Sequence, residues 1–153
     1  MKSIAQERCL QELLTRLQRV TPESTRRWGT LTPGEMLCHL GDAAESVLGI
    51  RIPPGPASSA RPRPVFKWLI LYSPVPWPKG VQTRPGVDPR REGTKPSSFA
   101  NDQARAINSL RELAVASADG LAPAHFRIGR MSQRDWRRWA YKHVDHHLRQ
   151  FGE

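Results

Sequence analysis

Three of the five histidines of the chain lie within five residues near its C-terminus, at positions 143, 146 and 147. His143 and His147 are four residues apart, a spacing that places two imidazoles on one face of an α-helix, about 6 Å apart along its axis. Two imidazoles in this arrangement can bind one metal ion. Because two ligands do not complete a metal site, we expect a further ligand from another part of the chain.

His39 is the candidate for the third ligand, since it is the single histidine of a predicted helix. Glu35 and Asp42 lie one turn before and one turn after it on the same face. Either acid could accept an imidazole N–H, add a ligand or act as the base of a hydrolytic reaction. Alternatively, Glu35 only caps the helix and Asp42 faces water. Together with His143 and His147, His39 predicts a three-histidine metal site with open positions for water and substrate.

The rim of this site has further candidates. His146 is three residues from His143, so a small rotation of the helix would make it a ligand in place of His147. The four-residue spacing is the commoner one in metal sites, which favours His147 and leaves His146 at the rim. His125 lies in the loop before this helix and could approach the mouth of the site, although a surface position explains it as well. Two tryptophans are also expected to line the rim, Trp77 and Trp139.

Two amphipathic helices are predicted in the first third of the chain. Apolar residues recur at helical spacing over residues 4–20. A second helix has a clear start signal, in which Thr32 is a good N-cap and Glu35 completes a capping box three residues later. Gly49 is a natural end for this helix. His39 therefore lies near the middle of the second helix.

Two more helices are predicted in the last third of the chain. The third begins after residue 97 or 98, where a serine can cap it, and ends at residues 119–120, which read Asp-Gly. The fourth begins after Ser132, with Asp135 three residues on, and runs to about Phe151. Four amphipathic helices predict an all-α fold, a four-helix bundle that forms a single domain over residues 1–153. Such bundles build metal sites from side chains on facing helices.

A long proline-rich crossover (residues 50–97) is expected between the second and third helices. Eleven of the fourteen prolines fall in it, and only residues 65–72 are apolar enough for a short helix. Its aromatic residues, which include Trp68 and Trp77, argue against full disorder because such side chains tend to pack. We therefore expect the crossover to lie over the body of the protein.

The chain is strongly basic, with a net charge of +10. The basic residues are spread along the chain. Residues 51–96 contain nine lysines and arginines and two acidic residues, and residues 127–149 contain seven lysines and arginines and two acidic residues. This distribution favours a solvated basic surface, and with no helix-turn-helix or finger pattern we do not expect nucleic acid as a partner.

Cys9 and Cys38 form no CxxC motif and are expected as buried thiols in a reducing cytoplasm. No apolar run approaches 18 residues, so we expect no membrane partner.

Several of these stretches resemble the DinB/YfiT-like proteins, a superfamily of helical metalloproteins. The resemblance rests on two features taken together: the segment from Trp28 to His39, which ends in the histidine of the second helix, and the pair His143 and His147 of the fourth helix. Three further stretches resemble an uncharacterised bacterial branch of the superfamily: residues 67–74, 76–85 and 135–152. The resemblance covers nearly the whole chain from Trp28 on. It implies a four-helix bundle of up-down-down-up topology, in which His39, His143 and His147 hold a divalent metal ion.

The resemblance also implies a range of functions. Characterised members include thiol-dependent transferases and related metal-dependent enzymes, often as dimers. We therefore expect a hydrolase or thiol-dependent transferase that holds one Zn, Ni, Fe or Mn ion. Its substrate would be a small molecule, anionic or thiol-containing, and the protein would be a homodimer. One departure concerns the loop histidine, since Phe126 follows His125 where we would expect a proline. The alternatives are a non-catalytic metal-binding stress protein and a basic nucleic-acid-binding helical module.

Overall fold

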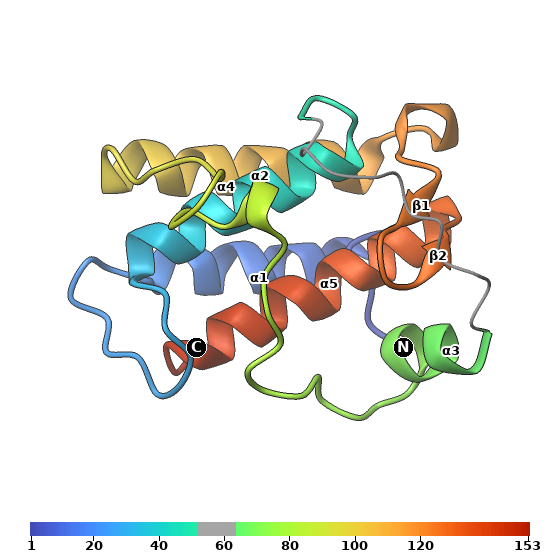
Figure 1. Cartoon of the computed structure of the whole chain (residues 1–153), viewed down its shortest axis with the longest axis horizontal. Coiled ribbons are helices and arrows are strands. Elements are labelled where there is room, and N and C mark those ends of the chain that lie inside the picture. Colours follow the sequence, from blue (N-terminus) through green and yellow to red (C-terminus); the bar gives the residue numbers. More distant parts are fainter. Residues whose placement is uncertain (52–63) are drawn as a thin grey trace.

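The computed structural model describes residues 1–51 and 64–153 and shows a mostly helical protein (Figure 1). The helices of this part of the chain are α1 (Glu7–Arg19), α2 (Pro33–Val47), α3 (Pro64–Tyr72), α4 (Phe99–Val115) and α5 (Gln133–Gln150). The described residues also form two short 3-10 turns, η1 (Pro85–Val87) and η2 (Ala118–Gly120), and two strands, β1 (Ala124–His125) and β2 (Gly129–Arg130). The strands pair antiparallel as a small hairpin. None of these helices is long and apolar enough to cross a membrane.

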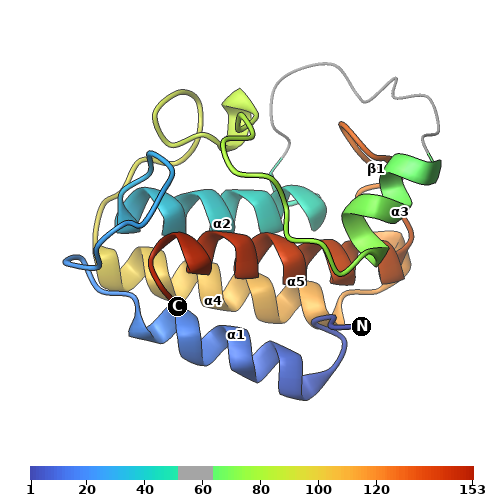
Figure 2. The ribbon, with the colours of Figure 1, turned by 90° about the horizontal axis from the view of Figure 1, so that it is seen from below.

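The four long helices α1, α2, α4 and α5 lie side by side and enclose one apolar core (Figure 2). α2 packs against α4 and α5, and α1 packs against the same two helices. The centre of the core consists of leucines and a methionine that are fully buried: Leu13, Leu14, Leu17, Met36, Leu37, Leu113 and Leu148. All four helices contribute to this set, as their apolar spacing predicted. α3 lies at one end of the molecule, beside the first half of α5.

Capping boxes set the starts of the two helices that carry the candidate ligands. In α2, the Glu35 backbone N–H donates to Thr32 Oγ1 at 3.2 Å and the Thr32 N–H donates to Glu35 Oε2 at 2.7 Å. In α5, the Asp135 N–H donates to Ser132 Oγ at 3.2 Å and the Ser132 N–H donates to Asp135 Oδ2 at 2.9 Å. Both boxes were predicted, and each fixes the helical position of every residue that follows it.

Two predicted helix limits were wrong. α1 begins at Glu7, because Ile4 instead packs in the core and donates its N–H to the Arg137 carbonyl at 3.2 Å. α4 ends at Val115 and not at residue 120. The reason is the Ala116 carbonyl, which accepts hydrogen bonds from the Gln133 and Arg137 side chains of α5 and so turns away from the helix axis. Residues 118–120 form the separate turn η2.

The proline-rich crossover contains the predicted short helix, α3. Residues 52–63 of the crossover lie outside the described residues. After α3 the chain runs extended and crosses over α5 (Figure 1). Two contacts hold this crossing segment: Trp77 Nε1 donates to the Ile70 carbonyl at 2.9 Å, and Lys142 Nζ donates to the Ser73 carbonyl at 2.9 Å. The described part of the crossover therefore lies over the body of the protein, as expected.

Candidate metal centre

The three predicted histidines meet inside the protein. His39 comes from α2, and His143 and His147 come from adjacent turns of α5. The ligand atoms of these three side chains all lie within 4.8 Å of one another. Each residue is buried, with exposed fractions of 4%, 9% and 8%. The structure thus brings together residues that are 104 positions apart in the chain.

The distance between the imidazole nitrogens fits metal ligation. His39 Nε2 and His143 Nε2 are 3.0 Å apart. Two imidazole nitrogens bound tetrahedrally to one zinc ion, each about 2.0–2.1 Å from it, would lie about 3.3 Å apart. The imidazole planes of the three rings are steeply inclined to one another, at 66–86°. The cluster therefore has the spacing of a site for one small cation.

Hydrogen bonds at the far side of two rings determine which nitrogen is free. His39 Nδ1 lies 2.7 Å from the Val87 carbonyl oxygen, and His147 Nδ1 lies 2.9 Å from Gln150 Oε1. Because both partners are oxygens that only accept, the imidazole proton is on Nδ1 in each ring. The Nε2 lone pairs then face the centre of the cluster. Such outer contacts orient metal-binding histidines and raise their basicity.

The cluster is electrically neutral at neutral pH. Burial lowers the pKa of His143 and of His147 well below the usual 6.5, and the neighbouring histidines lower both further. Burial also lowers the pKa of His39, although the Val87 carbonyl and the Asp42 carboxylate oppose this shift. Neutral imidazole is the form that binds a metal ion, so no proton has to leave before ligation at pH 7.

Aromatic rings surround His143, and His146 lies beside the cluster with its ring 5.4 Å from that of His147. Trp139 stacks on His143 with ring centroids 4.5 Å apart, and Trp77 of the crossing segment lies 6.1 Å from the same ring. His146 lies edge-on against Trp28 at 4.7 Å and is partly exposed. Among the described residues, the histidine cluster that could hold a metal ion contains His147 and not His146. The register of α5 is therefore the one that the four-residue spacing favoured.

His125 does not reach the three-histidine cluster. It lies in β1, with its ring 5.6 Å from that of Trp139 and 5.9 Å from that of Trp136. Its Nδ1 accepts a hydrogen bond from the Arg127 backbone N–H at 3.2 Å. Burial, followed by the charges of Arg127 and Arg84, lowers the pKa of His125 to about 4. Its ring contacts Trp139, which stacks on His143, so among the described residues His125 meets the cluster through that tryptophan.

Asp42 and Glu35 bond to other residues and not to the cluster. The Asp42 side chain is fully buried, where it accepts hydrogen bonds from the Thr94 N–H and hydroxyl, both at 2.7 Å, and from Arg105 Nη2 at 2.6 Å. Glu35 completes the capping box and pairs with Arg90 at 2.8 Å. The alternative that Asp42 faces water is wrong, because the Arg105 and Thr94 partners pull it toward α4 and the loop before it. The proposed base roles thus have no support from their positions.

The contact that orients His39 has no signal in the sequence. The Val87 carbonyl belongs to the turn η1, in a loop that Arg51 holds through the Gly86 and Glu92 carbonyls at 3.3 Å and 2.9 Å. Asp42 fastens the same loop through Thr94. A backbone carbonyl carries no side-chain signature, so only the fold reveals it. We refer to this arrangement of Asp42, Arg51 and Thr94 as the loop clamp.

The contact that orients His147 depends on Gly29. A Cβ atom at Gly29 would lie 2.9 Å from the Gln150 side-chain nitrogen, and this glycine has a positive φ of 86° that other residues rarely adopt. The missing side chain leaves room for the Gln150 amide beside His147. Gln150 could have been found from the sequence, since it lies three residues after His147 on the same helix face.

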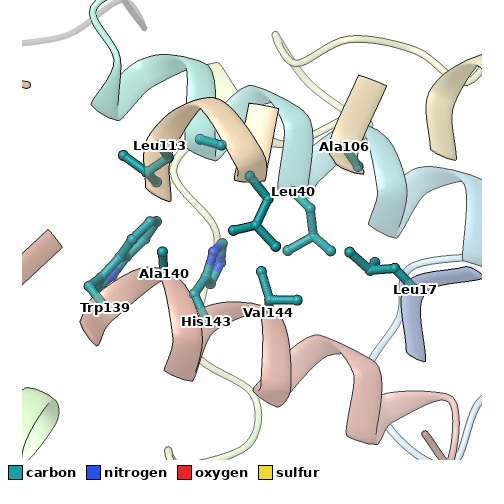
Figure 3. Close-up of a pocket in the computed structure, with 10 residues that line it drawn as sticks. Leu17, Leu40, Ala106, Leu113, Trp139, Ala140, His143 and Val144 are labelled. Carbon is teal, nitrogen blue, oxygen red and sulfur yellow. The ribbon is translucent and has the colours of Figure 1, made fainter. Parts of the chain in front are cut away.

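A small cavity lies behind His143, between α5 and the helices α1, α2 and α4 (Figure 3). Its volume is about 10 Å³, and its lining is apolar apart from the edges of His143 and Trp139. Leu40, Val144 and Leu113 are among the side chains that border it. A space of this size and polarity is a packing gap of the core and does not hold a substrate.

Comparisons with known proteins place the chain in a family. Neither the curated proteins nor the solved structures include one that matches the chain. One protein family does match, over residues 6–153, and its description is "Protein of unknown function (DUF1569)". The match spans the four long helices and all three histidines of the cluster. The chain therefore belongs to the DUF1569 family.

Proposed function

We propose that the protein is a divalent-metal-dependent enzyme of the DinB-like class, whose four long helices form an up-down-down-up bundle. The observation that carries this proposal is the convergence of His39, His143 and His147, buried and neutral, with the Nε2 lone pairs of His39 and His147 directed at the centre of the cluster. Burying three imidazoles costs far more than burying leucines of similar size, unless their polar atoms gain a strong partner. A metal ion is such a partner.

The donor set suits several ions and leaves room for a substrate. Three neutral imidazoles bind Zn, Ni, Fe or Mn, and a site with three protein ligands retains an open coordination position. A bound ion would supply Lewis-acid chemistry toward an oxygen or sulfur atom of a small molecule. This chemistry suits a hydrolase or a thiol-dependent transferase, and the net charge of +10 favours an anionic or thiolate substrate.

The residues around the cluster would control what reaches it. Trp139 and Trp77 cover two sides of His143 and exclude water from that ring. His146 stands at the rim, partly exposed, where it can meet a substrate without being a ligand. We assign no base role to Asp42 or Glu35, because their carboxylates are engaged elsewhere.

Elemental analysis of the purified protein tests the metal site. We expect about one divalent ion per chain. The double variant His143→Ala/His147→Ala should lose it, since one imidazole does not hold such an ion. His146→Ala is the matched control, because it removes a neighbouring histidine from the same helix and should leave the metal content unchanged. Equal metal content in the double variant would exclude the site, and loss in His146→Ala but not in His147→Ala would overturn the helix register.

Turnover distinguishes an enzyme from a metal-binding stress protein. The metal-loaded protein would be assayed against a panel of activated esters, amides and electrophiles with low-molecular-weight thiols. We expect metal-dependent turnover of at least one class, absent from the double variant. Metal binding without any turnover would favour the non-catalytic alternative. Sedimentation velocity in the same buffer would test the proposed homodimer.

A further inference from the structure

The helix α3 presents its apolar side to solvent. Val65, Trp68 and Leu69 are 72%, 56% and 48% exposed and follow helical spacing, so they form one apolar stripe. Leu71 alone in this helix is buried. A surface helix of a globular protein normally turns its apolar side to the core. In α3, Leu71 with Ile70 and Tyr72 packs against the core, but a second apolar side, the stripe, faces solvent.

Polar contacts hold α3 in this orientation. Lys67 Nζ pairs with Asp135 Oδ2 of α5 at 2.6 Å and donates to the Arg130 carbonyl at 2.7 Å. The Tyr72 hydroxyl donates to the same Asp135 carboxylate. The polar groups of the helix thus face the protein, and the apolar stripe cannot turn inward without breaking them. An exposed apolar patch that is fixed in place marks an interaction site.

The surface around the apolar stripe is almost purely cationic. The neighbouring segments 64–75 and 121–142 contain a single acid, Asp135, which is buried and paired with Lys67. The same segments contain seven cations. Three of them are exposed, and we call these the basic rim: Arg127, Arg130 and Arg134. Figures 1 and 2 show α3, the β1–β2 hairpin and the first half of α5 together at one end of the molecule. The partner of this end must therefore be anionic and must accept apolar side chains.

We propose that this end of the molecule docks on an anionic lipid surface. Trp68, Val65 and Leu69 would enter the boundary between head groups and acyl chains, where tryptophan and aliphatic side chains are favoured. The basic rim would meet the lipid phosphates. The sequence alone led us to expect no membrane partner, because no apolar run approaches the length of a membrane span. This proposal does not depend on the metal centre.

Two other occupants fit the surface less well. A second copy of the chain, joined through a two-fold axis, would bring one basic rim against the other. Nucleic acid would satisfy the cations but would leave the stripe of Val65, Trp68 and Leu69 without a role, since aliphatic side chains do not contribute to phosphate binding. An anionic lipid surface satisfies both the charge and the apolar exposure.

Vesicle co-sedimentation of the full chain tests the proposal. We expect binding to mixed phosphatidylcholine and phosphatidylglycerol vesicles, weakened by high salt, and much weaker binding to phosphatidylcholine alone. Trp68→Ser/Leu69→Ser should lower the partition coefficient about tenfold by removing apolar insertion. Arg130→Gln/Arg134→Gln, which changes two exposed cations of the rim, should lower it several-fold on anionic vesicles only.

Matched controls remove similar groups from other surfaces. Val81→Ser changes an exposed apolar residue of the crossing segment, and Arg19→Gln/Arg91→Gln changes two exposed cations outside the rim. Both should bind vesicles like the wild type. Equal binding by all variants, or no binding of the wild type to anionic vesicles, would overturn the proposal.

Three further results would reject the lipid proposal and assign the apolar stripe or the basic rim another role. Conversion of a dimer to a monomer by Trp68→Ser/Leu69→Ser, seen by sedimentation velocity, would assign the stripe to a second copy. A large fall in the melting temperature of that variant would show that the stripe packs within the chain. Binding of DNA or RNA that needs Arg130 and Arg134 but not Trp68 would assign the basic rim to nucleic acid.

Discussion

At the scale of single residues, the candidate site depends on atoms that hold each imidazole in one tautomer. His39 donates to a backbone carbonyl, whereas His147 donates to a side-chain amide. The two hydrogen bonds differ in whether a substitution can remove the acceptor. A backbone carbonyl survives most substitutions, but the Gln150 amide does not. Gln150 is therefore the residue through which the orientation of a ligand can be changed without removing the ligand.

The variant Gln150→Ala should bind metal more weakly while retaining all three histidines. Loss of the amide frees His147 to rotate and to protonate at either nitrogen, and contacts of this kind are worth about 10–100-fold in metal affinity. Competition with a chromophoric chelator would measure the change. Gln11→Ala is the control, since Gln11 is exposed on α1 and bonds to Glu7 there. Equal affinities for the two variants would contradict a role of Gln150 in orienting His147.

The ring of His125 should make the stability of the protein depend on pH. Burial lowers its pKa to about 4 in the folded state, against 6.5 when exposed. Between these values the unfolded chain binds more protons, so the free energy of unfolding falls as the pH drops from 6.5 toward 4. His125→Asn should show a shallower fall over this window in urea unfolding. The same slope in both proteins would contradict the burial of a neutral imidazole.

At the scale of elements, the starts of α2 and α5 were predictable and the loops were not. Thr32 with Glu35 and Ser132 with Asp135 are local signals, because each acts within three residues of sequence. They fix the registers of α2 and α5, which explains why the three histidines could be chosen before any fold was known. The loop clamp joins residues more than 40 positions apart, and no local pattern encodes it.

The loop clamp should couple α2 to the orientation of His39. In Asp42→Asn the bonds from Thr94 and Arg105 weaken, and loss of hydrogen bonds to a buried carboxylate should lower the free energy of unfolding by about 2 kcal/mol. The freed loop would also move the Val87 carbonyl away from His39. Nitrogen NMR of the metal-free protein would then show His39 as a mixture of tautomers and His147 unchanged. The exposed Asp119→Asn should change neither measurement.

At the scale of the whole molecule, the path of α3 could not be predicted. The sequence indicates a short apolar helix at residues 65–72, and such a segment is usually packed inward. Lys67 and Tyr72 reverse that outcome, because their shared partner Asp135 lies on α5, 63 positions beyond Tyr72. The orientation of a short apolar helix thus depends on where its few polar groups find partners, which is a property of the complete fold.

Metal binding should stabilise the entire protein, because the three ligands join α2 to α5 across the core. An ion that binds only the folded chain adds about 2.7 kcal/mol to the free energy of unfolding at 100 times its dissociation constant. Thermal unfolding should therefore shift upward with added zinc, and a chelator should reverse the shift. His146→Ala should behave like the wild type, whereas His143→Ala/His147→Ala should not respond. A zinc-dependent shift that persists in the double variant would place the ion elsewhere on the chain, since binding to His39 alone is too weak to produce it.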